Sequence, residues 1–204
     1  FSLLWYRRTQ QLLETMDAKT HRIYELIETE MLNPADGMPG ATDHSIGRRI
    51  AGYYMLTFCY LPFARPLPNP EAAIDLILKA VTPQGEIGEG GMCQNWDAMF
   101  VLNYVCRLTR WQYRHEEVCK LADTVSDFLL SVHRKQDGGF SFHPDCCIQE
   151  HNQVRVAPAL PESDSVGTLM ALGCLNIAQG LREKRPYQTF AECYHKVVMG
   201  RRPQ

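Results

Sequence analysis

The stretch of sequence that decides the fold reads Glu89-Gly90-Gly91-Met92-Cys93-Gln94-Asn95-Trp96-Asp97-Ala98-Met99-Phe100-Val101-Leu102. Two glycines open it as a turn, a short polar segment follows, and Asp97 precedes a continuous apolar run. Because an aspartate side chain can accept a hydrogen bond from the first turn of a helix, we expect Asp97 to start a helix that reaches about residue 108. A helix that is apolar around most of its circumference must be buried on several sides.

The same order of helix, glycine turn, polar segment, acidic residue and helix occurs at two other places. One copy covers 36–45 and contains Asp43 and His44, while another starts at 137–140 and reaches Asp164 after an insertion. The copies recur at spacings of roughly 55 to 65 residues, which is typical of helical-hairpin repeats. Inner helices surrounded by outer helices would bury this pattern. We therefore predict an all-α fold, either an α/α toroid or a partial toroid.

Apolar residues at three- and four-residue steps predict helices along most of the chain. The predicted helices cover 2–32, from 43 or 45 to about 60, 71–81, 97–108, 116–134, from 163 or 164 to about 179, and 186–199. Residues 141–162 have no clear period and form a long loop insertion, and no segment has a strand pattern. We expect residues 1–204 to form a single α/α-repeat domain that is part of a longer toroid.

Composition excludes several classes of protein. The chain has 204 residues, 45% of them hydrophobic and 22% charged, and a net charge of −2. This charge does not favour nucleic-acid binding or a basic membrane-binding patch. No apolar run reaches the roughly 18 residues that a membrane span requires. The eight cysteines mostly occupy apolar helical positions, which favours reduced thiols and a cytoplasmic location, although targeting signals can be missing from this sequence.

The third copy carries a family resemblance. Gln136-x-Gly138-Gly139-Phe140, followed by an acidic cap and the inner-helix segment Leu169-Met170-Ala171-Leu172, resembles the repeats of the terpene-cyclase and protein-prenyltransferase α/α-toroid superfamily. The resemblance covers about 36–181. It implies that the glycine turns and the inner-helix N-termini line a central cavity, where Asp43, His44, Trp96, Asp97 and Asp164 would face a ligand.

The chain also departs from that superfamily. It lacks the Asp-x-Asp-Asp proton-donor motif of squalene-hopene cyclases and the full Gln-x-x-x-Gly-x-Trp repeat. Asp145-x-Cys147 and Tyr194-His195 are similar to the zinc ligands of prenyltransferase β-subunits, but Asp145 lies in the insertion and not at the start of an inner helix. We therefore predict no metal or other cofactor.

The predicted site combines acids with ligand-binding side chains. Asp97, Asp164 and Asp43 could act as general acids or bases if they cluster in an apolar cavity, although helix capping alone explains their positions. Ligand contacts are predicted for Trp96, His44, Asn95, Tyr53, Arg48 and His143. Tyr54, Trp111 and Tyr113 are further aromatic candidates, which core packing also explains. The metal-ligand residue types in 143–151 match no standard zinc spacing.

Two functions remain open. The chain could bind a small molecule in a central cavity, either an isoprenoid as in the terpene cyclases and prenyltransferases, or a carbohydrate as in toroidal lyases and hydrolases. Alternatively, it could be a non-catalytic helical-repeat module that binds another protein, and a homo-oligomer is compatible with either function. The sequence does not decide whether the chain is an enzyme.

Overall fold

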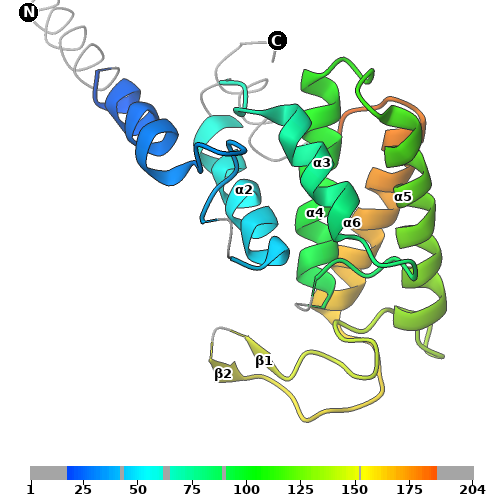
Figure 1. The fold of residues 1–204 in the computed structure, drawn as a ribbon. Coiled ribbons are helices and arrows are strands. Elements are labelled where there is room, and N and C mark those ends of the chain that lie inside the picture. Colours follow the sequence, from blue (N-terminus) through cyan, green and yellow to red (C-terminus); the bar gives the residue numbers. More distant parts are fainter. Residues whose placement is uncertain (1–17, 42–43, 62–64, 89–90, 152, 188–204) are drawn as a thin grey trace, which may run out of the picture.

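The computed structural model describes residues 18–41, 44–61, 65–88, 91–151 and 153–187 (Figure 1), and these are mostly helical, as predicted. Residues 18–26 are α-helical and continue into a π-helical turn, η1 (Ile27–Met31). The helices that follow in the described residues are α2 (Ile46–Tyr60), α3 (Pro70–Ala80), α4 (Met92–Leu108), α5 (His115–Phe128), the π-helical turn η3 (Leu129–His133) and α6 (Ser165–Arg182). The all-α class is therefore confirmed.

The helices form two layers with α4 at the centre. The inner layer consists of α2, α4 and α6, which point the same way with their N-termini at the lower end of Figure 1. In the outer layer, α3 packs against α2 and α4, and α5 packs against α4 and α6. Because α4 has neighbours on several sides, all its side chains from Ala98 to Cys106 are buried.

Three turns of similar construction lead into the inner helices. Each contains one isolated antiparallel bridge, and the paired residues are Leu32 with Pro39, Val81 with Ile87, and Arg134 with Phe140. A glycine with positive φ lies within each turn, at Gly37 (68°), Gly85 (102°) and Gly138 (89°). Glycine tolerates this conformation because it has no Cβ. In the second turn the glycine is Gly85, and not Gly90 or Gly91 as the sequence pattern indicated.

The start of α4 differs from the prediction. The helix begins at Met92, and the residue before it, Gly91, has a φ of 64° and no capping side chain. The backbone N–H of Met92 donates instead to the carbonyl of Phe142, 3.0 Å away in the insertion. Asp97 therefore lies in the second turn of α4, and the prediction that it caps the helix is wrong. Ser45 and Asp164, each one of two predicted cap candidates, do cap α2 and α6, because each accepts a hydrogen bond from its own helix.

The insertion contains the strands of the described residues. β1 (Glu150–His151) pairs antiparallel with β2 (Val154–Arg155), so the prediction of no strand is wrong here. This hairpin lies beyond the N-terminal ends of the inner helices (Figure 1). Most of the predicted helix over 186–199 lies outside the described residues, and its first two residues are not helical.

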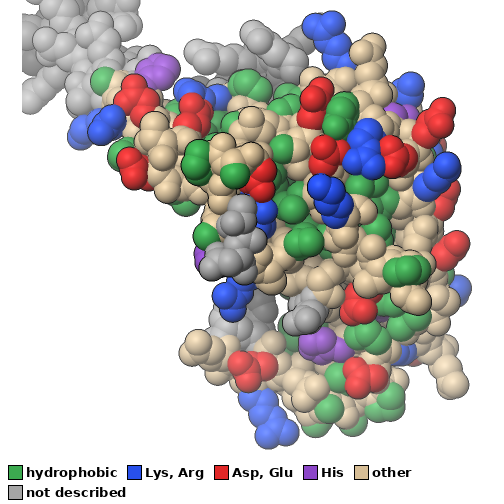
Figure 2. All heavy atoms as spheres, in the orientation of Figure 1, with side chains coloured by type: hydrophobic (Ala, Val, Ile, Leu, Met, Phe, Trp, Pro, Cys, Tyr) green, Lys and Arg blue, Asp and Glu red, His purple; other side chains and the backbone are tan. Residues whose placement is uncertain are grey.

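The described residues show no membrane-spanning helix, a surface of mixed charge and free thiols. None of the described helices is both long enough and apolar enough to cross a lipid bilayer. Acidic and basic side chains are interspersed over the face of the molecule that Figure 2 shows. The seven cysteines in the described residues are free thiols.

Candidate functional site

One side of α4 is less buried than the rest of the helix. Its partly exposed side chains include Cys93, Trp96 and Asp97, and the stripe continues through the nearly buried Phe100 and Tyr104. These positions are three or four residues apart and therefore share one face of the helix. We call this face, together with the side chains of α2 and α6 that contact it, the α4 stripe.

Aromatic rings form the wall of the α4 stripe on the α2 side. The indole Nε1 of Trp96 donates to the hydroxyl oxygen of Tyr54 at 3.1 Å. The Tyr54 ring meets Phe100 edge-on at 5.2 Å between centroids, and it meets Phe58 in the same way at 5.1 Å. Tyr187, which follows α6 in the chain, contacts Trp96 at 6.1 Å and Phe100 at 5.9 Å. Edge-to-face packing of this kind fixes the orientation of the rings.

The α6 side of the stripe fits closely against Trp96. A Cβ atom on Gly173 would lie 2.0 Å from Cζ3 of the Trp96 ring, so only glycine leaves room for the indole at this position. One helical turn earlier, the Sδ atom of Met170 lies 4.0 Å from the Sγ atom of Cys93. The stripe therefore offers mainly aromatic carbon and sulfur to its surroundings.

Asp97 is the acidic group of the α4 stripe. Among the residues that the structure describes, none donates a hydrogen bond to its carboxylate or forms an ion pair with it. Burial against apolar neighbours raises the pKa of Asp97 from an ordinary value of 3.8 to about 7. Its negative charge in turn contributes to raising the pKa of Tyr54, Cys93 and Cys174, after burial, which is the largest cause in each case. A carboxyl group with a pKa near neutrality can both donate and accept a proton.

Asp164, by contrast, serves as a structural anchor. One carboxylate oxygen accepts the N–H of Gly167 at 2.6 Å, while the other accepts those of Phe142 at 2.8 Å and Ile148 at 3.1 Å. These bonds cap α6 and hold the base of the insertion. In the described residues, no hydrogen bond joins Asp164 to Asp97. The third predicted acid, Asp43, lies outside the described residues.

Two of the predicted ligand-binding side chains are buried and form hydrogen bonds within the protein. Asn95 is buried, its amide nitrogen donates to the carbonyl of Gly85 at 3.0 Å, and its amide oxygen accepts the N–H of Ile87. It therefore holds the second glycine turn against α4. Tyr53 is completely buried, and its hydroxyl donates to the carbonyl of Pro68. Neither side chain faces the α4 stripe with a free polar group.

The predicted residues near the start of α2 lie at the surface. His44 and Arg48 are exposed, and no hydrogen bond or ion pair connects either side chain to the α4 stripe in the described residues. The neighbouring Arg49 is the buried member of the arginine pair, and its guanidinium binds both carboxylate oxygens of Asp36 at 2.6 and 2.7 Å. This ion pair fixes the first glycine turn to α2.

His143 and the cysteines of the insertion pack near the N-terminus of α4. The His143 ring meets Phe142 edge-on at 4.8 Å. Cys146 accepts a hydrogen bond from Gln149, while the thiol of Cys147 donates to the carbonyl of Pro158. Among the described residues, no three His, Cys, Asp or Glu side chains are arranged to hold a metal ion. The Tyr194-His195 pair lies outside the described residues.

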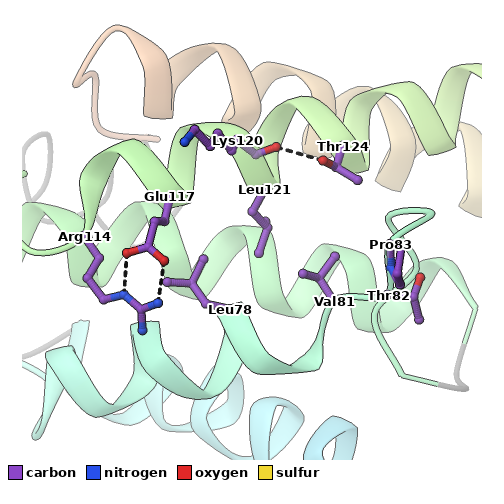
Figure 3. Close-up of a pocket in the computed structure, with 9 residues that line it drawn as sticks. All are labelled: Leu78, Val81, Thr82, Pro83, Arg114, Glu117, Lys120, Leu121 and Thr124. Atoms are coloured by element: carbon purple, nitrogen blue, oxygen red, sulfur yellow. Dashed lines mark hydrogen bonds and ion pairs between the residues drawn. The ribbon is translucent and has the colours of Figure 1, made fainter.

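The outer layer has a groove of its own. It lies between α3 and α5 and has a volume of about 480 Å³ (Figure 3). Leu78, Val81 and Leu121 are its apolar lining, and the ion pair between Arg114 and Glu117 lies at one end. The Arg114 guanidinium also binds Asp75, so its charge is neutralised within the protein. The groove therefore lacks the free acidic group that the α4 stripe provides.

Three residues of the α4 stripe, Asp97, Trp96 and Tyr54, are candidates that the sequence pattern indicated, whereas Phe100, Met170, Gly173 and Tyr187 are not. Phe100 lies three residues after Asp97 and four after Trp96, so helical spacing alone could have placed it on the same face. The contacts of Gly173 and Tyr187 with Trp96 join residues far apart in the sequence, and no local signal indicates them. The chain matches no known family model, no characterised protein and no solved structure.

Proposed function

We propose that the α4 stripe binds a small, mainly apolar molecule, and that Asp97 exchanges a proton with it. The observation that carries this proposal is a half-buried carboxyl group without a hydrogen-bond donor in the described residues, placed beside a wall of aromatic rings. Retaining such a group costs stability, because burial disfavours the charged form. Carboxyl groups whose pKa is raised by burial are often found at functional sites.

The chemistry of the stripe favours an isoprenoid-type ligand over a carbohydrate. Sugar sites need several polar groups that match the hydroxyls of the ligand. Here the polar groups beside the rings are the Asp97 carboxyl and tyrosine hydroxyls, among them that of Tyr54, whereas Phe100, Met170 and Trp96 offer apolar or aromatic surface. Aromatic faces also attract positive charge, which develops when an acid protonates an unsaturated hydrocarbon.

The architecture supports the proposal indirectly. Three turns with the same bridge and a positive-φ glycine lead into parallel inner helices, an arrangement expected for part of an α/α toroid. In such a toroid the inner helices would face a central cavity, and Asp97 and Trp96 lie on the inner helix at the centre of the described residues. We therefore propose a terpene-cyclase-like or prenyltransferase-like enzyme as the more specific form of this function.

Ligand panels test the proposal. We expect isoprenoid hydrocarbons and alcohols to raise the melting temperature and quench the fluorescence of Trp96, whereas oligosaccharides should do neither. Trp96→Phe should remove most of the quenching, and Trp111→Phe is the matched control because Trp111 packs against His115 outside the stripe. Stabilisation by oligosaccharides alone would refute the isoprenoid proposal.

A second function is favoured by exposed apolar side chains beside the stripe. Met55 and Phe58 of α2 are 60% and 56% exposed, and Leu169 and Leu172 of α6 are 73% and 55% exposed. Large exposed apolar surfaces often mark protein–protein contacts, including those between copies of one chain. Sedimentation of the wild type and of Leu169→Glu tests this function, which predicts association that the variant loses. A monomer at all concentrations would exclude self-association.

A further inference from the structure

The direction of one hydrogen bond leaves a proton available in the α4 stripe. The indole nitrogen of Trp96 can only donate, so the oxygen of Tyr54 is the acceptor in the 3.1 Å bond between them. The hydroxyl hydrogen of Tyr54 is not used in that bond. Among the described residues, no acceptor takes it. Tyr54 is therefore oriented by Trp96 while its own O–H can donate to something else.

Asp97 offers a second donor on the same face. It directly follows Trp96 in α4, and the Trp96 indole is bonded to the Tyr54 hydroxyl, so Trp96 adjoins both groups. An ionised Asp97 also contributes to raising the pKa of Tyr54. Below pH about 7 the Asp97 carboxyl is largely protonated, because burial raises its pKa. Burial also raises the pKa of Tyr54, so its hydroxyl keeps its proton throughout the neutral range. Two neutral O–H groups are then present beside an aromatic wall.

We propose that Tyr54 and Asp97 together bind an acceptor oxygen of the ligand, such as the carbonyl oxygen of an otherwise apolar ketone. This inference rests on the proposed function and specifies its ligand. Two O–H groups can donate to the two lone pairs of one carbonyl oxygen, and a pair of oriented donors in apolar surroundings stabilises negative charge that develops on that oxygen. An ammonium group would not fit, because it has no lone pair for the Tyr54 proton.

The geometry also explains the role of the wall. Phe100, Tyr187 and Met170 would contact the hydrocarbon part of the ligand, since the first two pack against Trp96 and Met170 packs against Cys93 on the same face. Gly173 keeps the indole in place by leaving room for it, and the indole keeps the Tyr54 hydroxyl in place. The acceptor oxygen is then held by the two polar groups, while apolar contacts supply the remaining affinity.

A matched pair of probes tests the inference. 2-Acetonaphthone carries a carbonyl group, and 2-ethylnaphthalene has nearly the same shape without it. We expect the 204-residue chain to bind the ketone ~10-fold more tightly than the hydrocarbon at pH 5.5, which is the effect of one good hydrogen bond. At pH 8.5 the preference should shrink several-fold, because an ionised Asp97 repels the carbonyl oxygen.

Three variants separate this role from a structural one. Tyr54→Phe should remove most of the ketone preference, whereas Tyr113→Phe should keep it, because the Tyr113 hydroxyl bonds to Asp75 in the outer layer. Asp97→Asn retains an N–H donor but cannot ionise. It should therefore keep the preference at pH 5.5 and lose its dependence on pH.

The outcomes distinguish this inference from the proposed function. If neither probe binds, the proposed function fails and this inference fails with it. If both probes bind equally to the wild type, the apolar site stands and the oxygen-binding role of Tyr54 and Asp97 is overturned. A ketone preference that survives Tyr54→Phe and is the same at both pH values overturns it as well.

Discussion

The substitution Asp97→Asn should stabilise the folded protein at neutral and alkaline pH. Asparagine has nearly the same shape as aspartate but cannot become charged. In the wild type, the pKa of Asp97 is 3.8 when the chain is unfolded and about 7 when it is folded. Between these values the unfolded chain has released a proton that the folded chain still holds. The wild type therefore loses stability as pH rises from about 4 to about 7, and the loss remains above that range.

The size of the effect follows from the two pKa values. A difference of one pKa unit corresponds to 1.36 kcal/mol, so raising the pKa of Asp97 from 3.8 to about 7 sets an upper limit of roughly 4 kcal/mol. Asp97 is only partly buried, and solvent screens part of its charge. We therefore expect about half of this limit, ~2 kcal/mol at pH 8, as the advantage of the asparagine variant.

Urea denaturation followed by circular dichroism measures this difference. Unfolding free energies of the wild type and of Asp97→Asn are compared at pH 5 and pH 8, where the advantage of the variant should grow by about 1–2 kcal/mol. Asp127→Asn is the control, since it removes an exposed carboxylate on the surface of α5. An advantage that is the same at both pH values, or a variant that is less stable at pH 8, would refute the reasoning about burial.

Four further substitutions test the turns, caps and buried histidine that hold the helices together. Asp164→Ala removes a helix cap and two bonds to the insertion, and we expect a loss of about 2–4 kcal/mol in unfolding free energy together with faster hydrogen exchange of the Phe142 amide. Gly85→Ala should lower the unfolding free energy by about 3 kcal/mol in thermal or urea unfolding, because the φ of Gly85 is positive and a Cβ would lie 2.4 Å from a backbone oxygen. Gly138→Ala should lower it by only about 1 kcal/mol, because a Cβ on Gly138 would enter open space. Burial lowers the pKa of His133, so the unfolded chain takes up a proton below pH about 6.5 that the folded chain resists, and stability should fall with acid. His133→Asn should show a smaller fall in acid urea titrations, and an unchanged fall would mean that other groups cause it.

The sequence could indicate some residues of the α4 stripe but not their surroundings. Trp96 and Asp97 stood out as candidates because they lie between a pair of glycines and a continuous apolar run. Their position within the helix depends on where α4 begins, and the N–H of its first residue bonds to the carbonyl of Phe142, about fifty residues away along the chain. Asn95, predicted to contact a ligand, is instead buried and bonded to the turn before the helix, which the local sequence pattern does not indicate.

The sequence alone determined the helical class and the glycine turns at Gly37 and Gly138, and it left two cap candidates each for α2 (Asp43 or Ser45) and α6 (Ser163 or Asp164). These features depend on hydrogen bonds and backbone angles within a few residues, so local composition is enough to indicate them. Only the tertiary structure decided that Asp97 is half-buried without a donor and that Trp96 orients the Tyr54 hydroxyl. Burial and the pKa it produces depend on which helices pack together, and this is a property of distant contacts that no local pattern records.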